Sequence, residues 1–472
     1  MDFQRHTIVT HVLSQLSDLY AQRLIEFCGT EERFPGISRG IEVLYTTDGG
    51  ASLRDREGRF IVRGVELEGR SNVSFVGVGR GKYDEHGTGK VECEATLVAR
   101  DLGLVRDQVS SDNFYGLERD GRVFKITSKD GKRSKTFIVS DPRLTHLLKA
   151  VAEDDIKGSR PFSLGSVVKT LHRAEYDANV VREIASAVFD AATKGPILKV
   201  ERQDRYRDAV RLLVLELSAM RGSYHELATQ RIERWLEKRR ENMQFQPFDI
   251  LDCIMLLVRD GVDAREWVRP ILEAELQDQH WFHTESATEA KNARLTEVTL
   301  TVFDGFVSRC EKRVVAVIES DDERVHAYLM ARDLGYYACC VVKKNGKGQV
   351  QVFPGSYEVT YDNGRKLKTD QKPFTHVMSY ITAGVREAEC NARGISCTAD
   401  WTILTSDDGP KEERSWFFHR LTGWLMNGSL TAPDVPPTSL SLDKIAEIIC
   451  EGMSNKYEDL RARAVENWKA RK

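Results

Sequence analysis

The sequence predicts an α/β fold in three parts. An N-terminal domain with a largely parallel sheet is expected over residues 1–158, a long helical connector or insertion over 159–295, and a smaller α/β domain over 296–472. Two observations lead to this division. Short apolar runs alternate with amphipathic helical patterns at both ends of the chain, as in βαβ units. Between these ends, helical spacing continues without a strand-like run.

The composition indicates a soluble, globular chain. Of the 472 residues, 41% are apolar and 30% are charged, and the formal net charge is −3. Binding to nucleic acid would therefore need a local basic patch. The chain has no apolar run of membrane-spanning length and no signal peptide, so we expect a cytoplasmic protein without a membrane partner. Nine cysteines without a CxxC pair argue against a disulfide framework or a zinc ribbon.

The N-terminal part begins with a strand and an amphipathic helix. Residues 7–12 are strand-like, and apolar residues over 16–27 repeat at helical spacing. This order places His11 at the end of the strand and Asp18 in the first turn of the helix. Both side chains could face the same crevice at the edge of the sheet. Further strands are expected over 41–45 and 59–65.

The predicted chemistry centres on residues 73–103. Residues 73–79 have the pattern of a buried parallel strand, and a glycine-rich turn and a helix follow it. The tip of the turn carries Asp84, Glu85 and His86. Loops at the carboxyl ends of strands are where open α/β sheets bind their ligands. Two carboxylates and an imidazole can ligate a divalent cation, although a merely solvated turn has the same composition.

Two charged segments follow this turn. Residues 116–141 predict a β-hairpin whose lysines and arginines suit either a phosphate backbone or the protection of an exposed sheet edge. A helix that starts at Pro142 then ends in an acidic run containing Asp154 and Asp155. Carboxylates are unfavourable at this end of the helix dipole, and either a bound cation or solvent would relieve the conflict.

The middle of the chain is predicted to be helical throughout, and its amphipathic faces could form a homo-oligomer or protein-partner interface. The expected helices cover 180–192, 206–220, 226–241 and 248–258.

The β/α pattern returns in the C-terminal part. We expect a strand over 313–319, a β-hairpin over 337–353, a loop-like segment around Thr369 to Pro373, two short apolar runs that flank His419, and a helix over 442–453.

Three N-terminal segments, residues 10–18, 83–86 and 152–158, resemble in order and setting the motifs of the DHH superfamily of metal-dependent phosphoesterases. The branch that the chain resembles most is the Myg type, which is similar to 3′-to-5′ RNA exonucleases. The stretch FFHRLTGWLMNG at 417–428 looks like the C-terminal histidine and glycine signature of that branch. The resemblance covers the two ends of the chain and not its helical middle.

The resemblance implies a metal-dependent phosphodiester hydrolase, a nuclease or nucleotide phosphodiesterase that acts between the N- and C-terminal domains. Its cofactor would be Mn²⁺ or Mg²⁺, and its substrate RNA, an oligonucleotide or a small nucleotide. The implied metal ligands are His11, Asp18, Asp84, Glu85, His86, Asp154 and Asp155. The implied catalytic residues among them are Asp84, His86 and Asp155. The substrate would be held by His419 and by the turn of Asn427, Gly428 and Ser429.

The chain departs from the family pattern at two positions. Leu16 stands where the first motif carries a second histidine, and Gly77 stands where an aspartate is expected at the end of a strand. Neither side chain can bind a metal, so the remaining ligands could hold one ion rather than two. Two alternatives stay open. One is a degenerate member that binds a nucleotide or a protein as a sensor or scaffold, and the other is a metal-free α/β protein in which the motifs are unrelated surface features.

Overall fold

The computed structural model separates the chain into two compact units, Met1–His280 and Trp281–Lys472, and each is described by itself. The helical segment predicted over 159–295 is therefore shared between them. The residues that the structure describes are 5–46, 59–62, 65–78, 82–84, 91–107, 114–128, 133–197, 199–222, 224–241, 248–303, 308–362, 367–407, 409–410, 415–419, 422–428 and 435–454.

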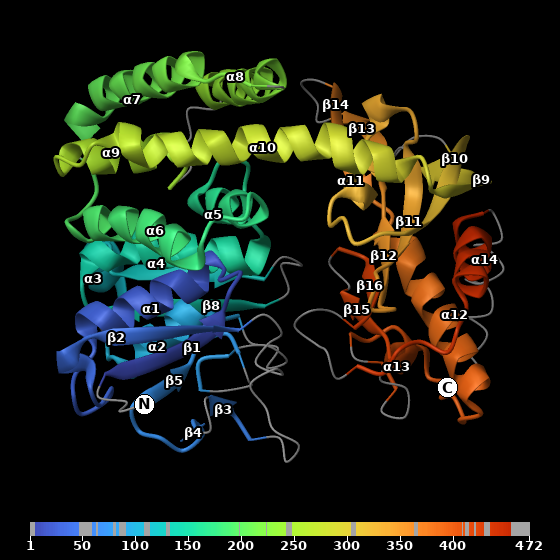
Figure 1. Cartoon of the computed structure of the whole chain (residues 1–472), viewed down its shortest axis with the longest axis horizontal. Coiled ribbons are helices and arrows are strands. Elements are labelled where there is room, and N and C mark those ends of the chain that lie inside the picture. Colours follow the sequence, from blue (N-terminus) through green and yellow to red (C-terminus); the bar gives the residue numbers. More distant parts are fainter. Residues whose placement is uncertain are drawn as a thin grey trace. The chain divides into compact units, whose positions relative to one another are not determined.

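The first unit contains a three-stranded parallel sheet (Figure 1). Its central strand, β1 (His6–His11), lies between β2 (Ile41–Thr46) and β5 (Val73–Phe75). Helix α1 (Leu16–Cys28) follows β1, and α2 (Glu94–Asp101) follows the segment after β5. Each helix thus begins beyond the carboxyl end of a strand. This arrangement confirms the α/β class that was predicted for the N-terminal part.

Smaller β elements complete this part of the first unit. The predicted strand over 59–65 is a pair of two-residue antiparallel strands, β3 (Ile61–Val62) and β4 (Val65–Glu66). The predicted hairpin is present as β7 (Val123–Thr127) and β8 (Ser134–Val139), and β6 (Val105–Asp107) pairs with β8. The short helix α3 (Phe114–Arg119) precedes β7.

The helices of the first unit pack in layers on the parallel sheet (Figure 1). Leu148, Val188 and Ile254 come from three of these helices, are fully buried, and belong to the same apolar core as Ile8 of β1. The segment between 159 and 280 is therefore continuous with the sheet domain through its core. These helices are α4 (Pro142–Lys157), α5 (Leu164–Arg173), α6 (Ala178–Thr193), α7 (Lys199–Ala219), α8 (His225–Glu241), α9 (Ile250–Arg259) and the start of α10 (Ala264–Ala290).

The second unit is built on a six-stranded mixed sheet in the order β15–β16–β12–β11–β10–β9. The β10–β11 pair is parallel, and the other neighbouring strands are antiparallel. These strands are β9 (Arg294–Phe303), β10 (Ser308–Glu319), β11 (Ala338–Lys344), β12 (Val350–Pro354), β15 (Phe417–His419) and β16 (Trp424–Asn427).

Side chains of this sheet alternate between two apolar clusters, as the two-residue repeat of a strand requires. Val315 and Val342 pack in one cluster with helices α12 (Thr375–Arg393) and α14 (Leu442–Met453). On the other side, Phe353 packs with residues of α11 (Val325–Met330). A short 3₁₀ turn at Arg332–Leu334 and helix α13 (Trp401–Leu404) complete the unit.

The prediction of a loop around Thr369 to Pro373 is wrong. Residues Leu367–Pro373 form strand β14, which pairs along its length with β13 (Ser356–Asp362) in a separate two-stranded ribbon. The sequence of β14 has no alternation of apolar and polar residues. The ribbon is formed by backbone hydrogen bonds between β13 and β14. Such bonds do not depend on side-chain type, so the sequence of β14 does not indicate the strand.

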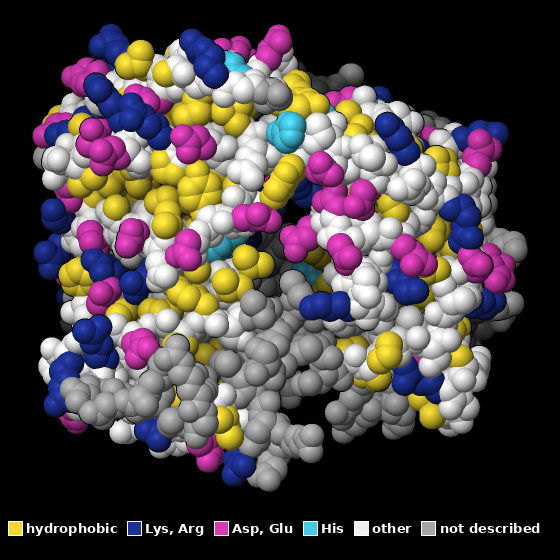
Figure 2. Space-filling model, viewed as in Figure 1, with side chains coloured by type: hydrophobic (Ala, Val, Ile, Leu, Met, Phe, Trp, Pro, Cys, Tyr) yellow, Lys and Arg dark blue, Asp and Glu magenta, His cyan; other side chains and the backbone are white. Residues whose placement is uncertain are grey.

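The surface of the first unit carries both signs of charge. Figure 2 shows lysines and arginines interspersed with aspartates and glutamates, in keeping with the net charge of −3. Among the described helices, none combines the length and the apolar character needed to cross a membrane.

The buried Glu389 side chain of α12 holds the loop before α14 through hydrogen bonds. Its carboxylate is fully buried and accepts hydrogen bonds from Trp416 Nε1 at 3.1 Å, Ser439 N at 2.7 Å and Arg393 Nε at 2.7 Å. Burial by itself raises the pKa of this carboxyl, but these donors and the Thr438 hydroxyl outweigh burial and leave the pKa below its usual value.

We expect acid to weaken the second unit through Glu389. Because the pKa is lower in the folded chain, the stabilisation is present above the ordinary pKa of 4.5 and is lost as the pH falls through the folded value. The Glu389→Gln variant should be less stable at neutral pH, because its NH₂ group cannot accept, and should lose this part of the pH dependence. Urea unfolding on both sides of pH 4.5 measures the effect. Equal pH dependence in the two proteins would contradict the assignment.

Candidate functional site at the carboxyl edge of the parallel sheet

His11 is the last residue of β1, and two hydrogen bonds hold the loop that follows it. His11 is half-buried, and its carbonyl accepts from Ser14 Oγ at 2.5 Å. His172 of α5 donates from Nε2 to the Ser14 carbonyl at 3.0 Å. Burial lowers the pKa of His172, so it holds this loop as a neutral imidazole. His172 could not be singled out from the sequence, because the contact joins segments that are far apart in the chain.

Asp18 lies in the first turn of α1 and is only 2% exposed. Its Oδ2 accepts from the Gln15 N–H at 2.9 Å and so caps the helix. Gly77, just after β5, faces the same carboxylate: a Cβ atom built on Gly77 would collide with Asp18 Oδ1. The position where the family pattern expects an aspartate is therefore next to Asp18, but only a glycine fits there.

The Gly77→Ala variant should be less stable than the parent chain. Gly77 has φ +67°, which an L-residue rarely adopts, and the new methyl group would also displace the Asp18 carboxylate. We expect a loss of about 1–3 kcal/mol in denaturant unfolding. Gly103→Ala is the matched control, because Gly103 has φ +74° and open space at its Cβ position. An equal loss in both variants would show that the contact with Asp18 has no effect.

Asp84 follows a segment that returns to the end of β5. The Gly77 N–H donates to the Tyr83 carbonyl at 2.9 Å, and Val76 and Tyr83 form a β-bridge. The Tyr83 hydroxyl donates to Asp101 Oδ2 of α2 at 2.6 Å, which anchors the segment. Asp84 is half-buried and comes next in the chain. Glu85 and His86, the other two predicted ligands of this turn, lie outside the described residues.

The two aspartates at the end of α4 accept hydrogen bonds from different segments of the chain. Asp155 Oδ1 accepts from Ser17 Oγ at 3.1 Å, which places Asp155 at the start of α1. Asp154 instead accepts from Ser159 Oγ at 2.9 Å and Ser163 Oγ at 3.3 Å, at the start of α5. Burial raises the pKa of Asp154. Of the two predicted ligands, Asp155 is the one that contacts α1, through Ser17.

Two cations of the basic hairpin have partners within the first unit. Lys135 Nζ lies 3.1 Å from Glu92 Oε1 and 3.3 Å from Asp107 Oδ1. Arg122 donates from Nε to the Val139 carbonyl at 3.2 Å. These contacts favour a structural role for both side chains over a contact with phosphate.

The predicted substrate residues of the second unit differ in their surroundings. His419 ends β15, is half-buried, and has its Nδ1 2.7 Å from Thr422 Oγ1. Asn427 is 1% exposed, and its Nδ2 donates to the carbonyls of Ser415 at 2.6 Å and Pro436 at 3.0 Å. The Asn427 side chain therefore holds two loops together.

The turn that follows has fewer described features. Gly428 has φ +73°, and a Cβ atom there would press on the Gln349 side chain. Ser429 lies outside the described residues.

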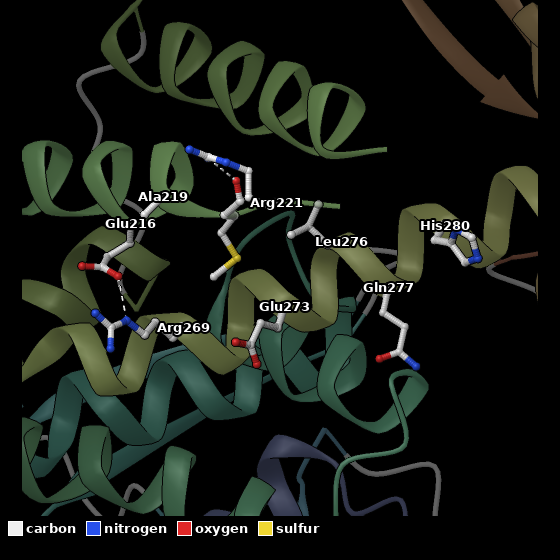
Figure 3. A pocket seen from close by; sticks show the side chains of 9 residues that line it. Glu216, Ala219, Arg221, Arg269, Glu273, Leu276, Gln277 and His280 are labelled. Atoms are coloured by element: carbon white, nitrogen blue, oxygen red, sulfur yellow. Dashed lines mark hydrogen bonds and ion pairs between the residues drawn. The ribbon is translucent and has the colours of Figure 1, made fainter. Parts of the chain in front are cut away.

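A cavity that the sequence did not indicate opens between α7 and α10 (Figure 3). Its volume is about 680 Å³, and its lining includes Arg221, Glu273 and His280. An ion pair from Arg269 Nε to Glu216 Oε2, 2.8 Å long, crosses one side. The predicted site residues are not part of its lining.

The donors at the sheet edge fit a hard divalent cation by type. Asp18, Asp84 and Asp155 supply carboxylate oxygens and His11 supplies an imidazole, which suits Mn²⁺ or Mg²⁺. Within the described part of the chain, no group of three or more His, Cys, Asp or Glu side chains is placed so as to hold an ion.

Comparison with known proteins gives no family: no family model, no curated protein and no solved structure matches the chain. The fold defines an α/β protein with a parallel sheet in its first unit and a mixed sheet in its second. The function therefore has to be argued from the site.

Proposed function

We propose that the chain is a metal-dependent phosphodiester hydrolase of the DHH type, a nuclease or nucleotide phosphodiesterase. One observation carries the proposal: separate segments of the first unit meet around the start of α1. They are the loop after His11, the segment from Gly77 to Asp84, and the end of α4 at Asp155, which contacts Ser17 beside Asp18. Segments that carry acidic residues and meet at the carboxyl edge of a parallel sheet support a catalytic site.

The chain orients these groups through its own hydrogen bonds. The Gln15 N–H fixes the Asp18 carboxylate, and the Ser17 hydroxyl contacts Asp155. The start of α1 also carries the positive end of a helix dipole, which favours anionic groups there. Carboxylates held in this way need little reorganisation when a ligand binds.

In the proposed reaction, the metal ligands are His11, Asp18, Asp84, Glu85, His86 and Asp155. A bound Mn²⁺ or Mg²⁺ would supply Lewis acidity, which lowers the pKa of water and neutralises phosphate charge. Water adds to phosphorus in line with the bond to the leaving oxygen, that bond breaks, and the leaving oxygen takes up a proton. The products are a phosphomonoester and an alcohol. His419 of the second unit is proposed to contact the substrate.

A second candidate is a degenerate member that binds a nucleotide or a protein without hydrolysis. Two observations favour it. Leu16 is 5% exposed and belongs to the apolar core, and Gly77 packs directly on Asp18, so neither position offers a ligand. This candidate predicts thermal stabilisation by a nucleotide without turnover.

Single-turnover cleavage of a 3′-labelled RNA separates the two candidates. We expect the wild-type chain to shorten the RNA with Mn²⁺ and to be inactive with EDTA. Short oligonucleotides and cyclic dinucleotides serve as further substrates. If the wild-type chain cleaves none of these with Mn²⁺, the hydrolase proposal fails.

A further inference from the structure

We propose that the outer face of helix α7 is a self-association surface, on which a second copy of this chain binds through its own α7 in the antiparallel direction. The inference narrows the interface expected in the helical middle of the chain to one helix and one partner. It is independent of the proposed hydrolase, because α7 carries none of the residues assigned to the site.

Helix α7 has a buried face and an exposed face. Ala209, Leu213 and Leu217 are at most 4% exposed and belong to the apolar core of the first unit. α7 lies at the outer side of the helical layers of this unit (Figure 1). Exposed residues at helical spacing follow its opposite side and form the α7 stripe, which consists of Val200, Asp204, Arg207, Asp208, Arg211 and Leu215.

The α7 stripe complements itself when two copies run in opposite directions. In an antiparallel pair centred between Arg207 and Asp208, Arg207 of each copy faces Asp208 of the other. Asp204 then faces Arg211, because both lie equally far from the centre. Val200 faces Leu215 at each end for the same reason. Every acidic side chain of the stripe therefore meets a basic one, and the apolar side chains meet each other.

This order of residues favours a second copy over a different protein. A surface that pairs with itself about a two-fold axis is what a symmetric dimer requires. The stripe carries two acidic and two basic side chains and so no net charge, which gives a strongly acidic or strongly basic partner no advantage.

The side chains of the stripe are open to such a partner. Val200 is 85% exposed and Leu215 is 56% exposed, so the dimer would remove both from water. The ion pair between Arg207 and Asp204 within one helix is 3.7 Å long, and its side chains are 67% and 80% exposed. Exposed pairs of this kind contribute little, so both groups remain available for the second copy.

The contact involves one helix from each copy and is therefore modest in size. α7 has 21 residues and so a length of about 30 Å. One such helix buries less than the roughly 800 Å² per partner of a standard interface. We therefore expect a reversible dimer, and one that salt weakens because its charges are exposed.

The test is analytical ultracentrifugation of the full chain at low ionic strength over a range of chain concentrations. We expect the wild-type chain to dimerise. Arg211→Asp should weaken the dimer by about 10-fold or more, because the contact occurs twice and each time changes from attraction to repulsion. Asp204→Arg should have an effect of the same size. Arg39→Asp makes the same change in charge at an exposed position before β2 and should leave the dimer unchanged.

A mixture of Asp204→Arg and Arg211→Asp separates the charge contact from any damage to the fold. In the mixed dimer, opposite charges face each other again at both contacts. We expect the mixture to dimerise about as tightly as the wild-type chain, although neither variant does so alone.

The result does not depend on the hydrolase, because the measurement needs neither metal nor substrate. The proposal is overturned if the wild-type chain is monomeric at every concentration. It is also overturned if Arg211→Asp dimerises as tightly as the wild-type chain, or if the mixture of the two variants does not dimerise.

Discussion

Replacing Asp18 with asparagine should lower the single-turnover rate of RNA cleavage in Mn²⁺ by about 100-fold or more. Loss of a residue that only contacts a metal ligand typically costs about 10- to 100-fold, and loss of a ligand itself should cost at least as much. Asparagine keeps a side-chain oxygen to accept from the Gln15 N–H, so the cap of α1 is preserved. It removes the negative charge that a hard divalent cation requires. Asp84→Ala should cause a loss of similar size, because Asp84 follows the segment that contacts Asp18 through Gly77.

The matched control is Asp190→Asn in α6. Asp190 Oδ2 forms an ion pair with Arg23 of α1 at 2.5 Å, and its side chain is 43% exposed. Exposed pairs contribute little, so the control should keep a rate within about twofold of the wild-type chain. If Asp18→Asn cleaved as fast as this control at every Mn²⁺ concentration, Asp18 would have no role in the reaction.

The largest effect on stability is expected for Arg386→Ala in α12. Arg386 is fully buried, and its guanidinium holds the chain around α13 and before β15 by donating to backbone carbonyls. The acceptors are Leu404 at 2.7 Å, Ser406 at 2.7 Å, Asp407 at 2.9 Å and Trp416 at 2.7 Å. Alanine would leave these carbonyls without their donor, so we expect a loss of about 3–5 kcal/mol in the unfolding free energy of the second unit.

Two variants test the reason for this loss. Arg386→Lys should also be destabilised, because an ammonium on a flexible stem cannot reproduce the planar fork of donors. Arg294→Ala removes an arginine that is 56% exposed and paired with Asp443, and should cost less than about 1 kcal/mol. Denaturant titration of all three gives the comparison. A loss for Arg386→Ala no larger than that for Arg294→Ala would contradict the assignment.

Local pattern was enough to predict many of the elements. The expected strand over 7–12 and helix over 16–27 are β1 and α1, and the expected helix over 442–453 is α14. In α1 and α14, apolar side chains recur with the helical period and pack on a core. In β1, the short uncharged run is buried on both faces, with Ile8 and Val9 in different apolar clusters. These local patterns carry the information. β14 shows the converse, since its pairing with β13 depends on backbone hydrogen bonds.

The site itself was only partly predictable, because its contacts join distant segments. The adjacent aspartates at the end of α4 look equivalent in the sequence. They point about 100° apart around the helix, so Asp155 meets Ser17 while Asp154 meets Ser163. The closeness of Gly77 to Asp18 likewise depends on tertiary packing.

The central claim is that the carboxylates around the start of α1 hold a divalent cation. Elemental analysis of the chain after equilibration with Mn²⁺ and removal of unbound ions tests it most directly. The account predicts one or two Mn²⁺ ions per wild-type chain and fewer in Asp18→Asn. A wild-type chain that retains no Mn²⁺, or no more than Asp18→Asn does, would contradict it.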